Sequence, residues 1–336
     1  MITVGNIKID VPVFLAPMSG ATDAPFRRQA SKFGAPVVVT EMIAGSELAT
    51  GRKDMVWRIA RPENTYPFVV QLAGRDPEWM FEASGIAAKA GADIIDINMG
   101  CPARKVTGGQ SGSALMRDLD LARSLIVATR EGSDKPVTVK MRLGWDDNSL
   151  NAPELAQICE EEDVKLLTVH GRTRCQFYEG HADWSKVKAV SDACNLPVIV
   201  NGDINTSKDA QIALNESAAQ GVMVGRAAMG QPWLLGQIAS ELTGNVFKAP
   251  SFSTKLEALC EQISDSIELY GERLGVRVFR KHLAAFIDSA KELQIDNAQR
   301  DNIRRNLCQI NNDTELKSEI KKLNHLSNLK IEAEVQ

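Results

Sequence analysis

Short apolar runs recur along the first two thirds of the chain and alternate with stretches in which apolar residues have helical spacing. Eight of these runs, rich in Val, Ile and Leu, have the length and composition of buried strands. They lie at residues 11–15, 37–40, 68–72, 94–98, 137–141, 166–170, 198–201 and 222–225. Segments between them, such as 77–90 and 113–130, are predicted to be helices. Eight strand–helix repeats favour a closed (β/α)8 TIM barrel, an α/β fold, over an open doubly wound sheet.

The alternation stops after Trp233, and a turn-rich segment at residues 248–254 follows. Thr254 and Glu257 have the spacing of a capping box, which predicts that a helix begins there. Apolar residues then recur every three or four positions at 256–270 and at 279–287, as in packed helices. We therefore divide the chain into a barrel domain at residues 1–245 and a smaller C-terminal helical domain at residues 252–325.

Composition limits the class and location of the protein. The chain has 336 residues, of which 44% are hydrophobic, so one large and one smaller domain can each bury a core. No segment is long and apolar enough to cross a bilayer, and the N-terminal residues lack the pattern of a secretory signal, so we expect a cytoplasmic protein. The six cysteines lie far apart, without the spacing of a metal site or a disulfide framework, and we expect no bound metal.

Charge bears on the choice of partner. The 39 basic residues against 43 acidic ones give a net charge of −4, so a nucleic-acid partner would need a local basic surface. Residues 273–305 provide such a region, with eight Lys or Arg residues and four Asp or Glu residues. This local excess of positive charge fits either a solvated helix face or an RNA-binding surface.

Chemically distinctive side chains follow the predicted strands. A barrel collects the carboxyl ends of its strands on one face, where barrel enzymes bind their ligands. The side chains expected on that face belong to Pro17, Met18, Glu41, Gln71, Asn98, Lys140, Arg142, His170, Arg172, Asn201, Asp203 and Arg226. A lone histidine such as His170 is as often structural as functional, but the neighbouring Arg172 and Arg174 favour a functional role.

The last two strands end in segments suited to a phosphate group. Gly225 and Arg226 follow the eighth strand, and Asn201, Gly202 and Asp203 follow the seventh. Free backbone amides and an arginine fork suit a phosphate dianion, and barrels often bind phosphate at this position. Gly225 taken alone is equally compatible with a tight turn, but the two segments together favour a phosphate site.

Lys140 and Arg142 both leave the end of the fifth strand, where a structural role would more often use apolar side chains. In a flavin site, a cation near the pyrimidine edge of the ring stabilises the anionic reduced flavin. The alternative is that one of these cations forms an internal salt bridge to Asp96 or Glu41. Both interpretations remain open at this point.

Cys101 follows the fourth strand directly and has three possible roles: an inert core thiol, a nucleophile or a proton donor. Its neighbours Gly100 and Pro102 place it in a loop, which disfavours the first role. A free cysteine thiol has a pKa of about 8.5, so thiols are largely protonated near neutral pH and can deliver a proton. We therefore prefer the role of proton donor. The glycine-rich segment at 108–112 would let the loop close over a bound base.

Several motifs together resemble those of the tRNA-dihydrouridine synthase family, most closely its bacterial B-type branch. They occur in the family's order as Ala16-Pro17-Met18, Thr22-Asp23-Ala24-Pro25-Phe26-Arg27, Asn98-Met99-Gly100-Cys101-Pro102, Lys140-Met141-Arg142, His170-Gly171-Arg172-Thr173-Arg174, Asn201-Gly202-Asp203 and Gly225-Arg226. The resemblance covers nearly the whole chain. It departs at Ala285 and Phe286, where many members of the family have a Trp-Tyr pair.

The resemblance implies an FMN-bearing barrel followed by a helical domain that binds tRNA, with NADPH as the reductant. Hydride would pass from N5 of FMN to C6 of a uracil, and Cys101 would protonate C5 from the other face. The residues that would bind FMN are Ala16, Pro17, Met18, Gln71, Lys140, His170, Arg172, Asn201, Gly202, Asp203, Gly225 and Arg226. Those that would contact the uridine or the tRNA are Asn98, Lys105, Arg142, Arg277, Arg280 and Lys281.

Two rival functions are compatible with parts of the sequence. Another FMN barrel enzyme, such as a dihydropyrimidine or enoate reductase, would explain the barrel and Lys140 but leaves the basic helical region without a role. The second rival is a non-catalytic RNA-binding or regulatory protein with a barrel fold, which a colourless preparation that cannot be loaded with FMN would favour. We expect a monomeric tRNA-modifying enzyme.

Overall fold

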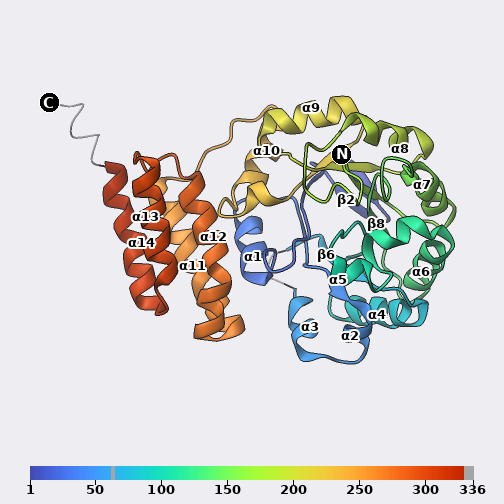
Figure 1. Cartoon of the computed structure of the whole chain (residues 1–336), viewed down its shortest axis with the longest axis horizontal. Helices are drawn as coiled ribbons and strands as arrows, with labels where there is room; N and C mark the ends of the chain where they lie inside the picture. The colour runs from blue at the N-terminus through green and yellow to red at the C-terminus, as the bar shows by residue number, and fades with distance from the viewer. Residues whose placement is uncertain (62–64, 329–336) are drawn as a thin grey trace.

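A computed structural model describes residues 1–61 and 65–328, and in it the eight predicted strands close into a barrel (Figure 1). They are β3 (Val13–Leu15), β4 (Val37–Val39), β6 (Phe68–Ala73), β7 (Ile94–Met99), β8 (Val137–Arg142), β9 (Leu167–His170), β10 (Val198–Asn201) and β11 (Gly221–Val224). Neighbouring strands are parallel, and the pairings of β4 with β6 and of β11 with β3 complete the ring. The predicted (β/α)8 fold is confirmed.

Helices cover the outside of the barrel and bury its aliphatic strands. They are α1 (Ala24–Lys32), α4 (Pro77–Lys89), α6 (Leu119–Glu131), α7 (Ala152–Glu161), α8 (Lys188–Ala193), α9 (Ser207–Ser217) and α10 (Leu234–Leu242). The segment predicted as one helix at 113–130 is instead a 3₁₀ turn, Gly112–Arg117, followed by α6. The break occurs at Asp118, whose carboxylate accepts a hydrogen bond from the Leu121 amide at 3.0 Å and starts α6 there.

Three small additions to the barrel were not predicted. An antiparallel hairpin of β1 (Ile2–Val4) and β2 (Ile7–Ile9) precedes the first barrel strand. Its apolar side chains pack with those of Phe14, Val69 and Met223 inside the barrel. A short strand β5 (Ile43–Ala44) with helices α2 (Gly45–Ala49) and α3 (Lys53–Arg58) lies between β4 and β6, and helix α5 (Arg104–Thr107) follows the Cys101 loop.

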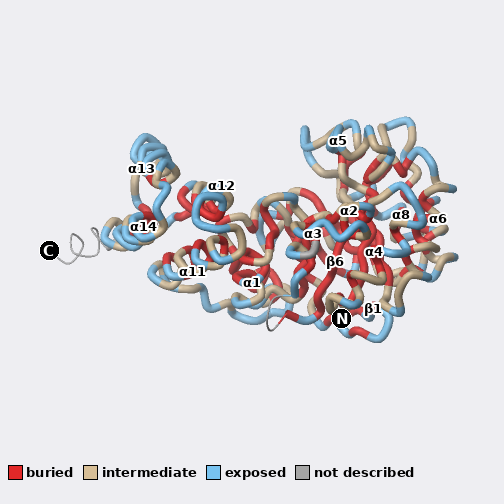
Figure 2. The backbone as a smooth tube through the Cα atoms, turned by 90° about the horizontal axis from the view of Figure 1, so that it is seen from below, coloured by how far each residue is buried: buried red, intermediate tan, exposed pale blue. Residues whose placement is uncertain are grey.

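Four C-terminal helices pack against one another beside the barrel (Figure 2). They are α11 (Phe252–Tyr270), α12 (Glu272–Ser289), α13 (Asn297–Gln309) and α14 (Asp313–Asn328). Their shared core includes Ile263, Phe279 and Ile320, and it reaches the barrel through Trp233. The division into domains at 245 and 252 remains our interpretation of this arrangement.

The predicted capping box at Thr254 and Glu257 is wrong. Helix α11 begins at Phe252, and its N-cap is Ser251, whose hydroxyl accepts a hydrogen bond from the Thr254 amide at 3.2 Å. The earlier start lets the Phe252 ring stack on Phe286, with 6.1 Å between ring centroids. Tertiary packing therefore decides between two N-cap candidates that are both acceptable locally.

In the described part of the chain, no helix combines the length and apolar character needed to span a membrane.

Candidate active site

Asn98, the fifth residue of β7, fixes the start of the Cys101 loop. Its side-chain oxygen accepts hydrogen bonds from the backbone amides of Gly100 at 3.1 Å and Cys101 at 2.9 Å. Its side-chain nitrogen donates to the Gln71 oxygen at 2.7 Å, which ties the loop to the neighbouring strand β6. The Cys101 side chain is partly exposed, so the thiol is held at the barrel mouth without being sealed in the core.

The 3₁₀ turn after α5 supports Cys101 from the other side. Ser113 donates to the Cys101 carbonyl from its amide at 3.1 Å and from its hydroxyl at 2.8 Å. Gly112 has a φ of +61°, and a Cβ added there would lie 2.9 Å from the Cys101 oxygen and 3.1 Å from its Cβ. A side chain at position 112 would therefore displace Cys101.

A chain of buried hydrogen bonds continues from Asn98 into the barrel. Gln71 donates to one oxygen of Asp96 at 2.7 Å, and Thr138 donates to the other at 2.6 Å. Burial raises the pKa of Asp96 to about 6, even though both hydrogen bonds favour the carboxylate. Because every member has a partner, this network fixes the side chains that face the mouth.

Lys140 lies at the end of β8 and is 9% exposed. Its ammonium donates to the Asn201 oxygen at 2.9 Å, and the Asn201 nitrogen donates to the Met223 carbonyl at 2.8 Å. Burial, followed by the charge of Arg142, lowers the pKa of Lys140 to about 8. Lys140 forms no ion pair with any carboxylate of the described residues, so the salt-bridge interpretation does not account for it.

Arg142 connects two loops at the mouth rather than pairing with an acid. Its guanidinium donates to the carbonyls of Gly100 at 2.8 Å, Thr173 at 2.7 Å and Phe177 at 2.8 Å. Burial lowers its pKa to about 10, which still leaves it charged at neutral pH. The predicted contact of Arg142 with the uridine remains a prediction, and the structure adds that it positions the segment containing Cys101.

The ends of β9, β10 and β11 bring two arginines onto one carboxylate. Asp203 accepts from Arg172 at 2.5 Å and from Arg226 at 3.1 Å. Burial is the largest single influence on Asp203 and opposes its ionisation, but the hydrogen bonds from Arg172 and the Ala182 amide, together with the charges of the two arginines, lower the pKa of Asp203. Burial and then the charge of Lys140 keep the pKa of His170 well below its usual value, so the imidazole is neutral.

Gly202 makes this close packing possible. It has a φ of +114°, and an added Cβ would lie 2.8 Å from the His170 ring and 2.7 Å from the Ala182 Cβ. The sequence placed Gly202 among candidate phosphate-binding residues, and its conformation also lets the loop after β10 approach His170.

The residues at the mouth are chemically suited to the FMN that the sequence resemblance implies. The Lys140 ammonium has three N–H donors, and among the described residues it donates only to Asn201. It can therefore donate further hydrogen bonds to a ligand. A Cβ added at Gly225 would meet only Ala16 and Met18, both at 3.7 Å, so the backbone there is open to close approach. The Arg226 side chain is 57% exposed and can reach an anion from this position.

Comparison with known proteins assigns the chain to a family. A family model described as Dihydrouridine synthase (Dus) matches residues 14–329. A protein named "Probable tRNA-dihydrouridine synthase" from Rhodobacter capsulatus is 50% identical over 292 residues, which cover 86% of this chain and 90% of the relative. The chain belongs to the dihydrouridine synthase family. A "tRNA-dihydrouridine synthase B" from Xanthomonas axonopodis pv. citri is 40% identical over 281 residues, covering 83% of this chain and 85% of that protein.

Solved structures support the fold. Morphinone reductase has a TM-score of 0.52 at 13% identity, with 75% of this chain and 91% of that chain covered. Histamine dehydrogenase from Rhizobium sp. 4-9 has a TM-score of 0.54 at 14% identity, with 78% and 50% covered. At these identities the likeness concerns the barrel alone. Membership of an enzyme family, by contrast, disfavours the non-catalytic RNA-binding alternative.

The basic residues that this enzyme carries at 273–305 fall into two groups. Four form hydrogen bonds or ion pairs within the protein, namely Arg280, Lys281, Arg300 and Arg304. Four have neither kind of partner among the described residues, namely Arg273, Arg277, Lys291 and Arg305. Lys105, on α5 beside Cys101, is also exposed. The predicted tRNA contacts of Arg280 and Lys281 remain predictions, but both side chains have internal contacts.

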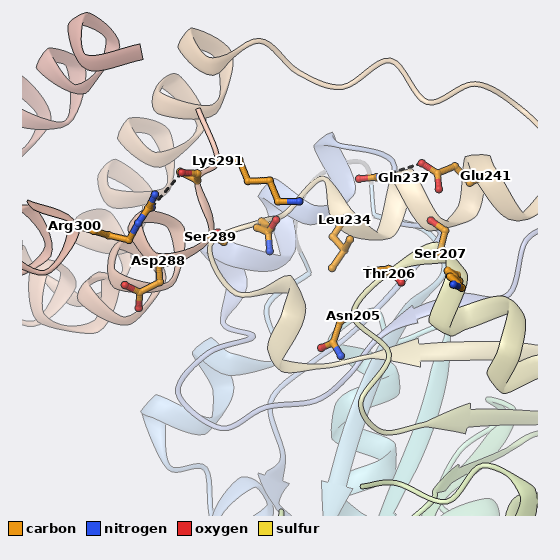
Figure 3. Close-up of a pocket in the computed structure, with 13 residues that line it drawn as sticks. Asn205, Thr206, Ser207, Leu234, Gln237, Glu241, Asp288, Ser289, Lys291 and Arg300 are labelled. Carbon is orange, nitrogen blue, oxygen red and sulfur yellow. Dashed lines mark hydrogen bonds between the residues drawn. The ribbon is translucent and has the colours of Figure 1, made fainter. Parts of the chain in front are cut away.

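A polar cleft of about 670 Å³ separates the barrel from the helical region (Figure 3). Asn205, Thr206 and Ser207 line it from the start of α9, only two residues after Asp203. Lys291 lines it from the segment between α12 and α13, Arg300 lines it from α13, and the acidic Glu241 and Asp288 also face it. The cleft therefore lies between α9 and α10 of the barrel and the ends of α12 and α13.

Three side chains at the site were not singled out from the sequence. Thr138 precedes Lys140 by two residues, so the alternation of a strand predicts that both face the barrel interior and could have identified it. Ser113 follows the glycine-rich segment, but no pattern marks its hydroxyl as a partner of Cys101. Tyr178 lies in an irregular segment, and its ring is 5.6 Å from the Arg142 guanidinium and 5.4 Å from that of Arg226. Only the folded chain brings these groups together.

Proposed function

We propose that this enzyme reduces the C5–C6 double bond of uridines in tRNA to give 5,6-dihydrouridine, with FMN as cofactor and NADPH as reductant. The observation that carries the proposal is the presence of Cys101 on a supported loop at the same mouth as the buried Lys140. A small metabolite would need only the barrel mouth and no binding surface outside it. The cleft and the exposed cations beside the mouth support a large polyanionic substrate.

Residues at the ends of β6, β8 and β11 would contribute to holding the cofactor. Lys140 and Gln71 would bind the polar edge of the flavin ring, and Arg226 with the open backbone at Gly225 would bind its phosphate. When bound and reduced, FMN supplies a hydride to C6 of the uracil. The positive charge of Lys140 suits an anionic reduced flavin, because a buried cation interacts strongly with a charge in a site of low dielectric constant.

Cys101 would supply the proton that C5 then requires. Asn98 and Ser113 fix the backbone on both sides of the thiol, so the donor is held in place before the substrate arrives. Arg142 ties the same loop to the segment at Thr173 and Phe177, which limits its displacement. After the transfer, the thiolate must recover a proton from solvent, and the partial exposure of Cys101 permits this.

A uridine within folded tRNA must leave its stack to reach the mouth, at a cost of a few kcal/mol. We infer that the RNA backbone lies across the cleft, where Lys208 and Lys291 face it from opposite sides. Contacts of this kind fix the position of the RNA without reading its sequence. The reaction would take place in the cytoplasm, with a single copy of the chain as the active unit.

The direct test is to compare substrates with the purified protein. We expect a yellow protein that, with NADPH, forms dihydrouridine in unmodified tRNA, as measured by mass spectrometry of nucleosides. Free uracil and simple enones serve as controls. Reduction of either at the rate found for tRNA would favour the small-metabolite reductase, and a colourless protein that cannot be loaded with FMN would contradict the flavin proposal.

A further inference from the structure

The turn between β3 and α1 links the proposed cofactor site to the helical region. Residues 16–18 begin this turn and are predicted to contact FMN. The Met18 carbonyl accepts hydrogen bonds from the amides of Ala21 at 2.9 Å and Thr22 at 3.0 Å. The Met18 amide donates to the Thr22 hydroxyl at 2.9 Å. The position of Met18 therefore depends on where residues 21 and 22 are held.

His282 of α12 holds this turn at Ala21. The His282 Nε2 atom lies 3.0 Å from the Ala21 carbonyl oxygen, and the His282 side chain is only 1% exposed. A carbonyl oxygen only accepts, so Nε2 must carry the proton. The imidazole also stacks on Phe26 of α1, with 4.5 Å between ring centroids. His282 thus contacts the turn and the helix that follows it.

Two further residues of the helical region contact the same turn. The Lys281 ammonium donates to the carbonyl of Gly20, and the amide of Gly20 donates to Glu41 of the barrel. The Tyr270 hydroxyl, at the end of α11, donates to the Asp23 carboxylate at 3.2 Å. Figure 1 shows α1 lying between the barrel and helices α11 and α12, which is where these contacts form.

Helix α12 also packs on the loop after β11. A Cβ added at Gly230 would lie 2.3 Å from the Phe286 amide nitrogen and 2.8 Å from the His282 carbonyl oxygen, so the two backbones are in direct contact. Gly225 begins the same loop, and a Cβ there would lie 3.7 Å from the Met18 sulfur. One helix therefore supports both loops that are predicted to flank the flavin.

We propose that His282, assisted by Lys281 and Tyr270, is a positioning residue that sets the turn at residues 16–23 for cofactor binding. The helical region then has a second role, in shaping the flavin site, besides contacting tRNA. This inference rests on the proposed FMN-dependent function and extends it. It also gives Lys281 a role other than direct contact with a phosphate group.

The expected consequence is a change in cofactor affinity measured without any tRNA. If the turn is released, FMN must order it on binding, and that ordering reduces the net affinity. Loss of one hydrogen bond between neutral groups corresponds to about 1 kcal/mol, or about a fivefold increase in Kd at 25 °C. A change of this size is measurable from the quenching of flavin fluorescence.

The experiment uses the full chain and compares His282→Phe with His282→Gln. His282→Phe keeps an aromatic ring against Phe26 but removes the donor, and we expect the Kd for FMN to rise about fivefold. His282→Gln keeps an N–H donor, and we expect it to restore most of the affinity. His325→Phe, the same exchange at an exposed position of α14, is the matched control and should bind FMN as the wild type does.

Three outcomes are distinguishable. If wild-type protein fails to bind FMN, the proposed function itself is contradicted. If wild type binds FMN and His282→Phe binds it equally well with an unchanged flavin spectrum, the positioning role is rejected. If His282→Phe does not fold, Tyr270→Phe is the deciding variant, because it removes only the hydroxyl that donates to the Asp23 carboxylate. We expect about a threefold rise in Kd for that variant, and an unchanged Kd would overturn the inference.

Discussion

The barrel mouth and the C-terminal helices use charged side chains in different ways. At the mouth, Lys140 and Asn98 are buried, and each is fixed by a hydrogen bond to a side chain of another strand. In the helical region, half of the cations of residues 273–305 are engaged within the protein and half are free among the described residues. Position at a strand end therefore predicts the location of a site, whereas a charge count does not show which cations face a partner.

The largest effect among the supporting residues is expected for Lys140→Met. Removing a charged hydrogen-bond donor of this kind costs about 1.5–3 kcal/mol, so we expect FMN affinity to fall by about 10-fold to 100-fold. Titration of the apoprotein with FMN measures it. Arg304→Met removes a cation that pairs with Asp288 and Asp301, far from the mouth, and should leave FMN affinity unchanged. Equal FMN affinities for wild type and Lys140→Met would show that the buried cation at the mouth contributes no more to cofactor binding than the paired cations of the helical region.

A second prediction concerns the loop that carries the thiol. Gly112→Ala adds a methyl group that would lie 2.9 Å from the Cys101 oxygen, and we expect tRNA reduction to slow by about tenfold through misplacement of the donor. FMN binding should be unaffected. Gly244 has a similar positive φ of +74°, and a Cβ added there would have no atom within 4 Å. Gly244→Ala therefore serves as the control for backbone strain. If both variants lose activity equally, strain rather than contact with Cys101 is responsible.

A third prediction sharpens the division among the basic residues. Arg277 is exposed without an ionic partner in the described part of the chain, so Arg277→Gln should weaken tRNA binding by about fivefold and reduce the salt dependence by about one unit of slope. Arg304→Gln should have a smaller effect, because Arg304 is paired with Asp288. Filter binding at several salt concentrations measures both. A larger loss for Arg304→Gln would show that the internal contacts do not predict which cations bind RNA.

The smallest predicted effect is a dependence of FMN affinity on pH. Burial lowers the pKa of Lys140 to about 8, so the free protein begins to lose this charge as pH rises through that value. An anionic ligand favours the protonated form, and affinity should fall by about fourfold between about pH 7 and about pH 8.5. Lys140→Met should flatten this profile. An affinity that rises with pH in wild-type protein would contradict the assigned contact.

Much of the fold was predictable because buried parallel strands leave a strong signal. Eight apolar runs with helical segments between them sufficed for the barrel. The β1–β2 hairpin was missed because its strands are three residues long and carry little periodicity. The start of α11 was misplaced because Ser251 and Thr254 are both good N-cap residues, and contact between Phe252 and Phe286 decides between them.

The candidate site was predictable at the level of residues but not of contacts. The strand-end rule brought Lys140 and Asn201 to the same face, where the structure joins them at 2.9 Å. The partners of Cys101 could not be inferred, because Ser113 is twelve residues away and reaches it through a 3₁₀ turn. Likewise, the tRNA contact predicted for Lys281 rested on the family resemblance and its basic surroundings, and neither reveals its contact with Gly20, which is 261 residues away in the sequence.

The most direct measurement follows the two halves of the reaction separately in the Cys101→Ala variant. Flavin reduction by NADPH and FMN content should match those of wild type, because Cys101 forms no part of the proposed cofactor contacts. Formation of dihydrouridine in tRNA should fall by about 10²-fold to 10⁴-fold, the usual contribution of a positioned general acid. Dihydrouridine formation at the wild-type rate in this variant would contradict the assignment of Cys101 as the proton donor.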